Sequence, residues 1–161
     1  MKSAALTFLN NGRGFQMAAE VVRHTDLEIA FPDLPVRHCL IIAIELYLKS
    51  FLLCRGMSEN EVKRVGHNLK KAAVEAIKRD LVLGDMNTQL MDLIQAEKTF
   101  TADRYIVPGS RRVPNIEPLN ALADVLYWTV GERLEQHHPG YKVGDEMMAP
   151  ARHIRASAKD L

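Results

Sequence analysis

Apolar residues dominate one long stretch of the chain, which lies between Pro35 and Gly56 and reads PVRHCLIIAIELYLKSFLLCRG. It is apolar on nearly every side of a helix, so it predicts the buried central helix of a bundle. Proline suits the first turn of a helix, and glycine suits the left-handed position just past its end. Glu45 and Lys49 lie one turn apart within this helix, and His38 shares their stripe.

Helical spacing of apolar residues predicts further helices on both sides of the central one. Their approximate ranges are 3–24, 58–65, 68–82, 85–100 and 119–137. Asn11, Gly12 and Gly14 predict a bend or break in the first of these helices. The predicted inward-facing residues are Ala4, Ala5, Phe8, Phe15, Ala18, Ala19, Val22, Leu69, Ala72, Ala73, Ala76, Ile77, Leu90, Met91, Leu93, Ile94, Ala96, Leu122, Leu126, Trp128, Val130 and Leu134.

Helix-start signals support several of these boundaries. Ser58 and Glu61 have the spacing of a capping box, in which each residue satisfies a backbone N–H of the other. Either His67 or Asn68 suits the N-cap of the helix that follows. Pro118 suits the opening of the last long helix. No hairpin or repeat pattern is found, so we expect an all-α protein, an antiparallel up-and-down bundle of about five helices.

Length and charge narrow the class of protein. The chain has 161 residues and a net charge of +1, which suits one domain without a general attraction for polyanions. We expect the bundle to span residues 1–140 and residues 141–161 to form a C-terminal arm, which either packs on a partner or stays partly mobile. No secretory signal is visible, and a charged pair in the apolar stretch argues against a membrane span. Cys39 and Cys54 are expected to be small buried hydrophobes in a reducing cytoplasm.

The sequence has no signature for common cofactor or metal chemistry. Six His are spread through the chain without HExxH, CxxC or Glu-x-x-His spacing, so no metal site and no cofactor are predicted. No phosphate loop and no GxSxG elbow occur either, which disfavours P-loop hydrolysis and elbow-type hydrolases. A small-molecule enzyme inside the bundle would need more inward carboxylates or His than Glu45 and His38.

Two pairs of polar residues, one in the central helix and one at a helix start, each have a structural and a functional interpretation. Glu45 and Lys49 have the orientation of a helical ion pair, which suits either a bridge in the core or a polar groove used in binding. His67 and Asn68 suit either a plain helix cap or, with two lysines in the next turn, a phosphate site.

A locally basic segment follows the helix predicted over residues 85–100. Arg104, Arg111 and Arg112 lie beside Tyr105 in a stretch rich in turn formers. A tyrosine of this kind stacks on a base while arginines bind phosphates, as in single-stranded RNA binders. The alternative is an ordinary solvated loop.

The order of these signals resembles the HEPN family (higher eukaryotes and prokaryotes nucleotide-binding domains). That family shows Glu-x-x-x-Lys on a long helix, followed by Gly-His-Asp/Asn-Leu and, further on, an Arg-Tyr. The matching positions are Glu45, Lys49, Gly66, His67, Asn68, Leu69, Arg104 and Tyr105. The similarity covers residues 15–107, and the last helix matches by topology alone.

The resemblance implies a helical bundle that forms a homodimer and binds RNA or a nucleotide through Glu45, Lys49, His67, Asn68 and the Arg-Tyr pair. Many family members are metal-independent ribonucleases of defence or toxin–antitoxin systems. These use an Arg, four to six residues and then a His, to hold the phosphate charge and to move the 2′-OH proton. The one match here is Arg133 with His138, which are therefore the implied catalytic pair. The alternative is a non-catalytic interaction module that regulates a partner protein such as a cognate antitoxin.

Overall fold

The computed structural model describes residues 2–25, 33–90, 92–93, 115–137 and 141–144. Its labelled helices are α1 Lys2–His24, α2 Asp33–Cys54, α3 Glu59–Val65, α4 Leu69–Ile77 and α6 Ile116–His137, and residues 86–90 and 92–93 are also helical. These described residues contain no β-strand, which confirms the all-α class. No helix among them is both long enough and apolar enough to span a membrane.

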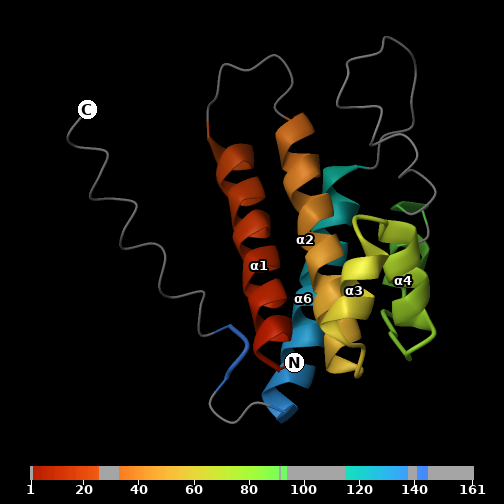
Figure 1. The fold of residues 1–161 in the computed structure, drawn as a ribbon. Coiled ribbons are helices and arrows are strands. Elements are labelled where there is room, and N and C mark those ends of the chain that lie inside the picture. The colour runs from red at the N-terminus through yellow and green to blue at the C-terminus, as the bar shows by residue number, and fades with distance from the viewer. Residues whose placement is uncertain (1, 26–32, 91, 94–114, 138–140, 145–161) are drawn as a thin grey trace.

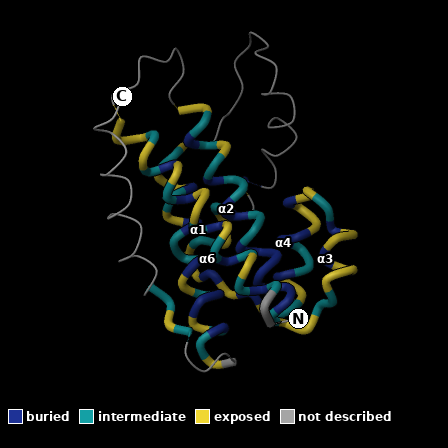
Figure 2. The backbone as a smooth tube through the Cα atoms, turned by 60° about the vertical axis from the view of Figure 1, so that its left-hand side comes forward, coloured by how far each residue is buried: buried dark blue, intermediate teal, exposed yellow. Residues whose placement is uncertain are grey.

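Helix α2 is the centre of the molecule, as its apolar composition predicts. It contacts α1, α3, α4 and α6, and eleven of its residues are buried. Figure 1 shows α1 beside it in antiparallel orientation, with α4 on its opposite side. Pro35 lies in the first turn, and Gly56 just past the end has the predicted left-handed backbone (φ 85°). Figure 2 shows the buried residues gathered where the helices meet.

Helix α1 is continuous, so the predicted break near Gly12 is wrong. Gly12 faces α2, and a Cβ atom there would lie 2.6 Å from Cε1 of Tyr47. The glycine therefore allows two helices to approach closely. The inward-facing stripe contains Leu9 and Gln16, whereas Phe15 is 39% exposed, contrary to prediction. Phe15 lies one position from Gln16, which places it about 100° away around the helix.

Helix α6 shows the same one-position error. Trp128 was expected in the core but is 43% exposed, and Tyr127 is buried instead. Tyr127 lies four residues after Ala123 and three before Val130, and both of these are buried. The buried stripe thus keeps helical spacing through Tyr127. Its ring lies 5.9 Å from that of Tyr47 on α2, measured between centroids.

The predicted caps of α3 and α4 are present. Ser58 and Glu61 form the capping box reciprocally, and the Asn68 side chain accepts a hydrogen bond from the Lys71 backbone N–H. Helix α4 ends at Ile77, earlier than expected. Asp80 adopts a left-handed backbone (φ 62°), and the Leu81 N–H donates to the carbonyl of Ala76 across the turn.

That turn stops α4 and directs Leu81 into the core, where it is buried. Ile77, predicted to face inward, is 42% exposed. The last helical residue is thus rotated away from the apolar face that the preceding alanines supply.

The chain after α6 returns to that helix. Val143 packs so closely on Gly131 that a Cβ atom there would lie within van der Waals overlap of it, and the Gly144 N–H donates to the Tyr127 hydroxyl at 3.2 Å. The Val143 N–H also donates to the Glu135 carboxylate. The first described residues of the expected C-terminal arm therefore pack against α6 of the same chain.

Candidate functional site

Three of the predicted site residues meet on one carboxylate oxygen. Lys49 Nζ lies 2.6 Å from Glu45 Oε1, and His67 Nδ1 lies 3.0 Å from the same atom. The Glu45 and Lys49 side chains are only 13% and 9% exposed, whereas that of His67 is 93% exposed. Glu45 thus joins a mostly buried lysine to an imidazole at the surface.

Chemistry fixes the direction of the imidazole hydrogen bond. An ionised carboxylate can only accept, so His67 Nδ1 carries the proton and donates it to Glu45. The second ring nitrogen, Nε2, is then an acceptor in the neutral ring. A histidine oriented by a carboxylate in this way can accept a proton from a ligand or receive a hydrogen bond from it.

The turn between α3 and α4 places His67 over α2. Gly66 ends α3 with φ 64°, a conformation that glycine adopts at little cost. Asn68 then caps α4, and the Lys71 amine donates to the Arg64 carbonyl at 3.0 Å, which joins the end of α3 to the first turn of α4. His67 is held between these two fixed points.

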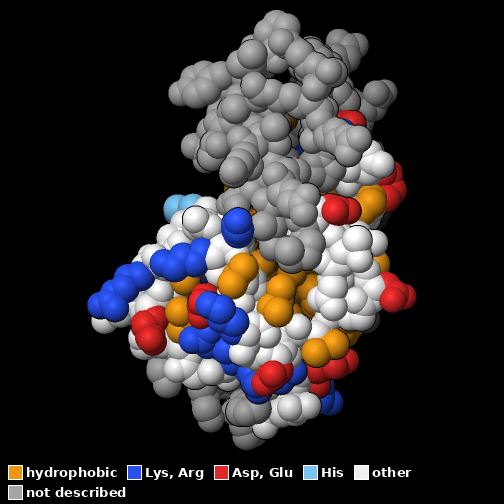
Figure 3. All heavy atoms as spheres, turned by 90° about the vertical axis from the view of Figure 1, so that its right-hand side faces the viewer, with side chains coloured by type: hydrophobic (Ala, Val, Ile, Leu, Met, Phe, Trp, Pro, Cys, Tyr) orange, Lys and Arg blue, Asp and Glu red, His pale blue; other side chains and the backbone are white. Residues whose placement is uncertain are grey.

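Positive charge is concentrated around this turn. Residues 55–80 contain seven basic and four acidic side chains, a net charge of +3 in a chain of +1. Residues 62–74 contain four basic residues and no acidic residue. They are Lys63, Arg64, Lys70 and Lys71, which are all exposed. We call these four residues with His67 the turn cluster. Figure 3 shows Lys and Arg side chains gathered on this side of the molecule.

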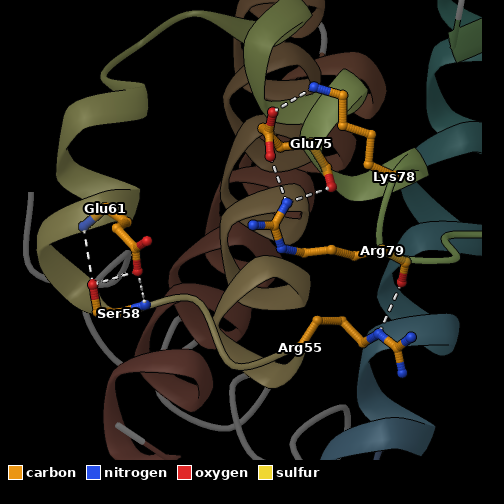
Figure 4. A network of polar contacts seen from close by, with 6 residues as sticks. All are labelled: Arg55, Ser58, Glu61, Glu75, Lys78 and Arg79. Atoms are coloured by element: carbon orange, nitrogen blue, oxygen red, sulfur yellow. Dashed lines mark hydrogen bonds and ion pairs between the residues drawn. The ribbon is translucent and has the colours of Figure 1, made fainter.

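A polar network anchors the opposite end of α4 to α2 (Figure 4). Arg55 Nε donates to the Arg79 carbonyl at 2.8 Å, and Arg79 Nη1 lies 2.5 Å from Glu75 Oε2. Lys78 Nζ lies 3.0 Å from the other Glu75 oxygen. Hydrogen bonds from Arg79 and Lys78 lower the pKa of Glu75. The basic residues at this end are therefore paired with acids.

Among the remaining predicted site residues, Arg133 lies apart from Glu45. The Arg133 guanidinium lies 5.3 Å from the centroid of the Phe51 ring, about 9 Å further along α2 than Glu45. It also opposes the burial that raises the pKa of the Cys54 thiol to about 11. His138, Arg104 and Tyr105 lie outside the described residues.

A second polar network was missed by the sequence reasoning. The buried Tyr47 hydroxyl donates to Gln16 Oε1 at 2.7 Å, and Gln16 Nε2 donates to Asp124 Oδ1 at 2.6 Å. Burial raises the pKa of Tyr47. The chain of bonds joins α1, α2 and α6 and fixes their register. Its only signal in the sequence is Gln16, a polar residue at the spacing of an inward-facing stripe.

The described part of the chain has no group of three or more His, Cys, Asp or Glu side chains placed to hold a metal ion. No family model, curated protein or solved structure matches this chain.

Proposed function

We propose that this chain is a HEPN-like bundle that binds single-stranded RNA through the turn cluster. The observation that carries the proposal is the set of four exposed basic residues on either side of an imidazole oriented by Glu45. Phosphates of RNA are attracted to such a surface, and the N-terminus of α4 adds a partial positive charge.

The residues of the resemblance fit this surface. Glu45 and Lys49 orient His67, Asn68 caps the helix, and the homodimer remains part of the proposal. The predicted stacking of Tyr105 on a base, with Arg104 on a phosphate, belongs to the same proposal.

A matched pair of lysines tests the binding surface. Lys70 lies in the first turn of α4, and Lys78 caps its other end and pairs with Glu75. The affinity for a labelled single-stranded RNA should fall in Lys70→Gln and remain unchanged in Lys78→Gln. Loss of one phosphate contact should also lower the slope of log affinity against log salt by about 0.7. Equal effects of the two changes, or no binding by the wild type, would reject the turn cluster.

The orientation of His67 also favours a second candidate function, metal-independent RNA cleavage. In this reaction His67 Nε2 takes the proton of a 2′-OH, whose oxygen attacks the adjacent phosphorus. The bond from phosphorus to the 5′-oxygen breaks, that oxygen takes up a proton, and the products are a 2′,3′-cyclic phosphate and a 5′-hydroxyl.

Incubation with RNA in excess EDTA separates the candidates. Cleavage lost in His67→Ala but retained in His138→Ala assigns the base to His67, and the reverse result supports the Arg133 and His138 pair. RNA binding without cleavage in the wild type leaves a binding protein, which is the non-catalytic alternative.

A further inference from the structure

The outward nitrogen of His67 has a chemical character that Glu45 determines. His67 Nδ1 lies 3.0 Å from Glu45 Oε1, so Nε2 is the ring nitrogen left to face solvent, on a side chain that is 93% exposed. The same carboxylate oxygen accepts a hydrogen bond from Lys49 Nζ at 2.6 Å. Glu45 is thus the acceptor toward both side chains, and the proton of a neutral imidazole stays on Nδ1.

A neutral His67 in this orientation cannot donate a hydrogen bond to a phosphate. With the proton on Nδ1, the Nε2 atom carries a lone pair, and the oxygens of an RNA phosphate are acceptors as well. A second proton turns Nε2 into a charged donor while Nδ1–H remains on Glu45. The ring can therefore bind a phosphate oxygen as an imidazolium without changing its position.

Charged groups from three helices surround the ring and act on its protonation in opposite directions. The carboxylate of Glu45 on α2 favours the imidazolium, and the Lys49 amine beside it opposes that effect. The cations within four residues of His67 also oppose it, and they are Lys63 and Arg64 of α3 with Lys70 and Lys71 of α4. A bound phosphate offsets this positive charge and places an anion beside Nε2, so it favours the protonated ring.

We propose that the turn cluster takes up one proton at His67 when it binds an RNA phosphate. This inference rests on the proposed function and adds a regulation to it, because the affinity then depends on pH. A proton taken up on binding makes the affinity highest at low pH, and the affinity falls as the pH rises through the range in which imidazoles titrate, near about pH 6.5. Cleavage with His67 as the base needs the unprotonated ring, so it would have the opposite dependence.

Binding of a labelled oligouridine measures this dependence, because neither uracil nor a phosphodiester titrates in the range of an imidazole. At constant ionic strength, the wild type should bind about threefold to tenfold more tightly at about pH 5.5 than at about pH 8, as expected for one charged hydrogen bond at an exposed site. The slope of log affinity against log salt should also be steeper by about 0.7 at the lower pH, because one more phosphate is contacted.

Two histidines provide matched variants. His67→Gln removes the titrating ring and should abolish the pH dependence of binding. His38 is also exposed and lies on the same stripe of α2, seven residues before Glu45, so His38→Gln should leave the dependence unchanged. Lys70→Gln should weaken binding by a similar factor at both pH values, because a lysine stays charged throughout this range.

The outcomes separate this inference from the proposed function. Affinity that does not change with pH would overturn proton uptake while RNA binding stands. Affinity that rises with pH would also overturn it, because Nε2 would then accept a hydrogen bond from a 2′-OH as a neutral ring. A dependence that persists in His67→Gln would assign the proton to another group and overturn the inference too. Only the absence of RNA binding at both pH values would reject the proposed function together with it.

Discussion

Two faces on opposite sides of α2 differ in how they meet solvent. The outward face of α1 is uncharged over most of its length, with small side chains at regular spacing. The face formed by α3 and α4 is densely charged, with a capping box, an asparagine cap and the ion pairs of Glu75 and Asp80. Both belong to one bundle and are built on the same buried helix.

The difference shows how each face is stabilised. Helix α1 packs on α2 and α6 over its whole inner side, so it needs no local polar contacts outside. Helices α3 and α4 have seven and nine residues, and helices this short are marginal in isolation. Their caps and ion pairs add the stability that such short helices lack. The side chains that form these contacts are charged or polar and lie on the surface.

The largest expected effect on stability is at Lys49, whose buried amine pairs with Glu45 beneath the charged face. Lys49→Ala would leave the Glu45 carboxylate mostly buried, with only the exposed His67 as a partner. Removing one partner of a buried ion pair typically costs 3–5 kcal/mol, so we expect a loss of about 3 kcal/mol in the free energy of unfolding. Urea denaturation measures it.

The control is the double variant Glu45→Gln, Lys49→Met, which removes both charges and keeps similar volumes. Replacing a buried pair by neutral groups is often nearly neutral, so stability should return toward that of the wild type. A loss below about 1 kcal/mol in the single variant would mean that the pair is solvated.

A matched pair of asparagines gives a smaller effect of opposite sign on the two faces. Asn68→Ala removes the cap of α4, whose oxygen accepts from the Lys71 N–H at 2.7 Å, and should cost about 1 kcal/mol. Asn11→Ala lies on the exposed side of α1 and should stabilise by roughly 0.5 kcal/mol through helix propensity. Thermal unfolding of the dilute proteins measures both, and equal signs would contradict the comparison.

The sequence predicted best what depends on neighbours in the chain. The capping box at Ser58 and the pairing of Glu45 with Lys49 follow from spacings of three and four residues. These interactions form within one helical turn, so the rest of the fold hardly affects them. The central helix was equally clear, because nearly every one of its sides is apolar.

The sequence failed where the partner lies far along the chain. Tyr127 and Trp128 are adjacent aromatic residues, and either could have occupied the core position. Tyr127 occupies it, where its ring packs against that of Tyr47 on α2. Gln16 donates a hydrogen bond to Asp124, which lies 108 residues further along the chain. His67 reaches Glu45 across 22 residues only because α3 ends where it does. These contacts join residues that are distant in the sequence, so no local sequence pattern predicts them.

The smallest effect is a difference in pH dependence at the start of α3. Hydrogen bonds from the Ser58 side chain and backbone lower the pKa of Glu61. A folded-state pKa below that of the unfolded chain stabilises above the unfolded value, near 4.3, and this contribution is lost as the pH falls through the folded value. Ser58→Ala should therefore lower the urea midpoint more at about pH 7 than at about pH 3.

In a Glu61→Gln background, the effect of Ser58→Ala should no longer depend on pH, because no carboxylate remains to titrate there. An effect that persisted in that background would place the responsible acid elsewhere, whereas a pH-independent loss with Glu61 present would show that the cap stabilises α3 without its charge.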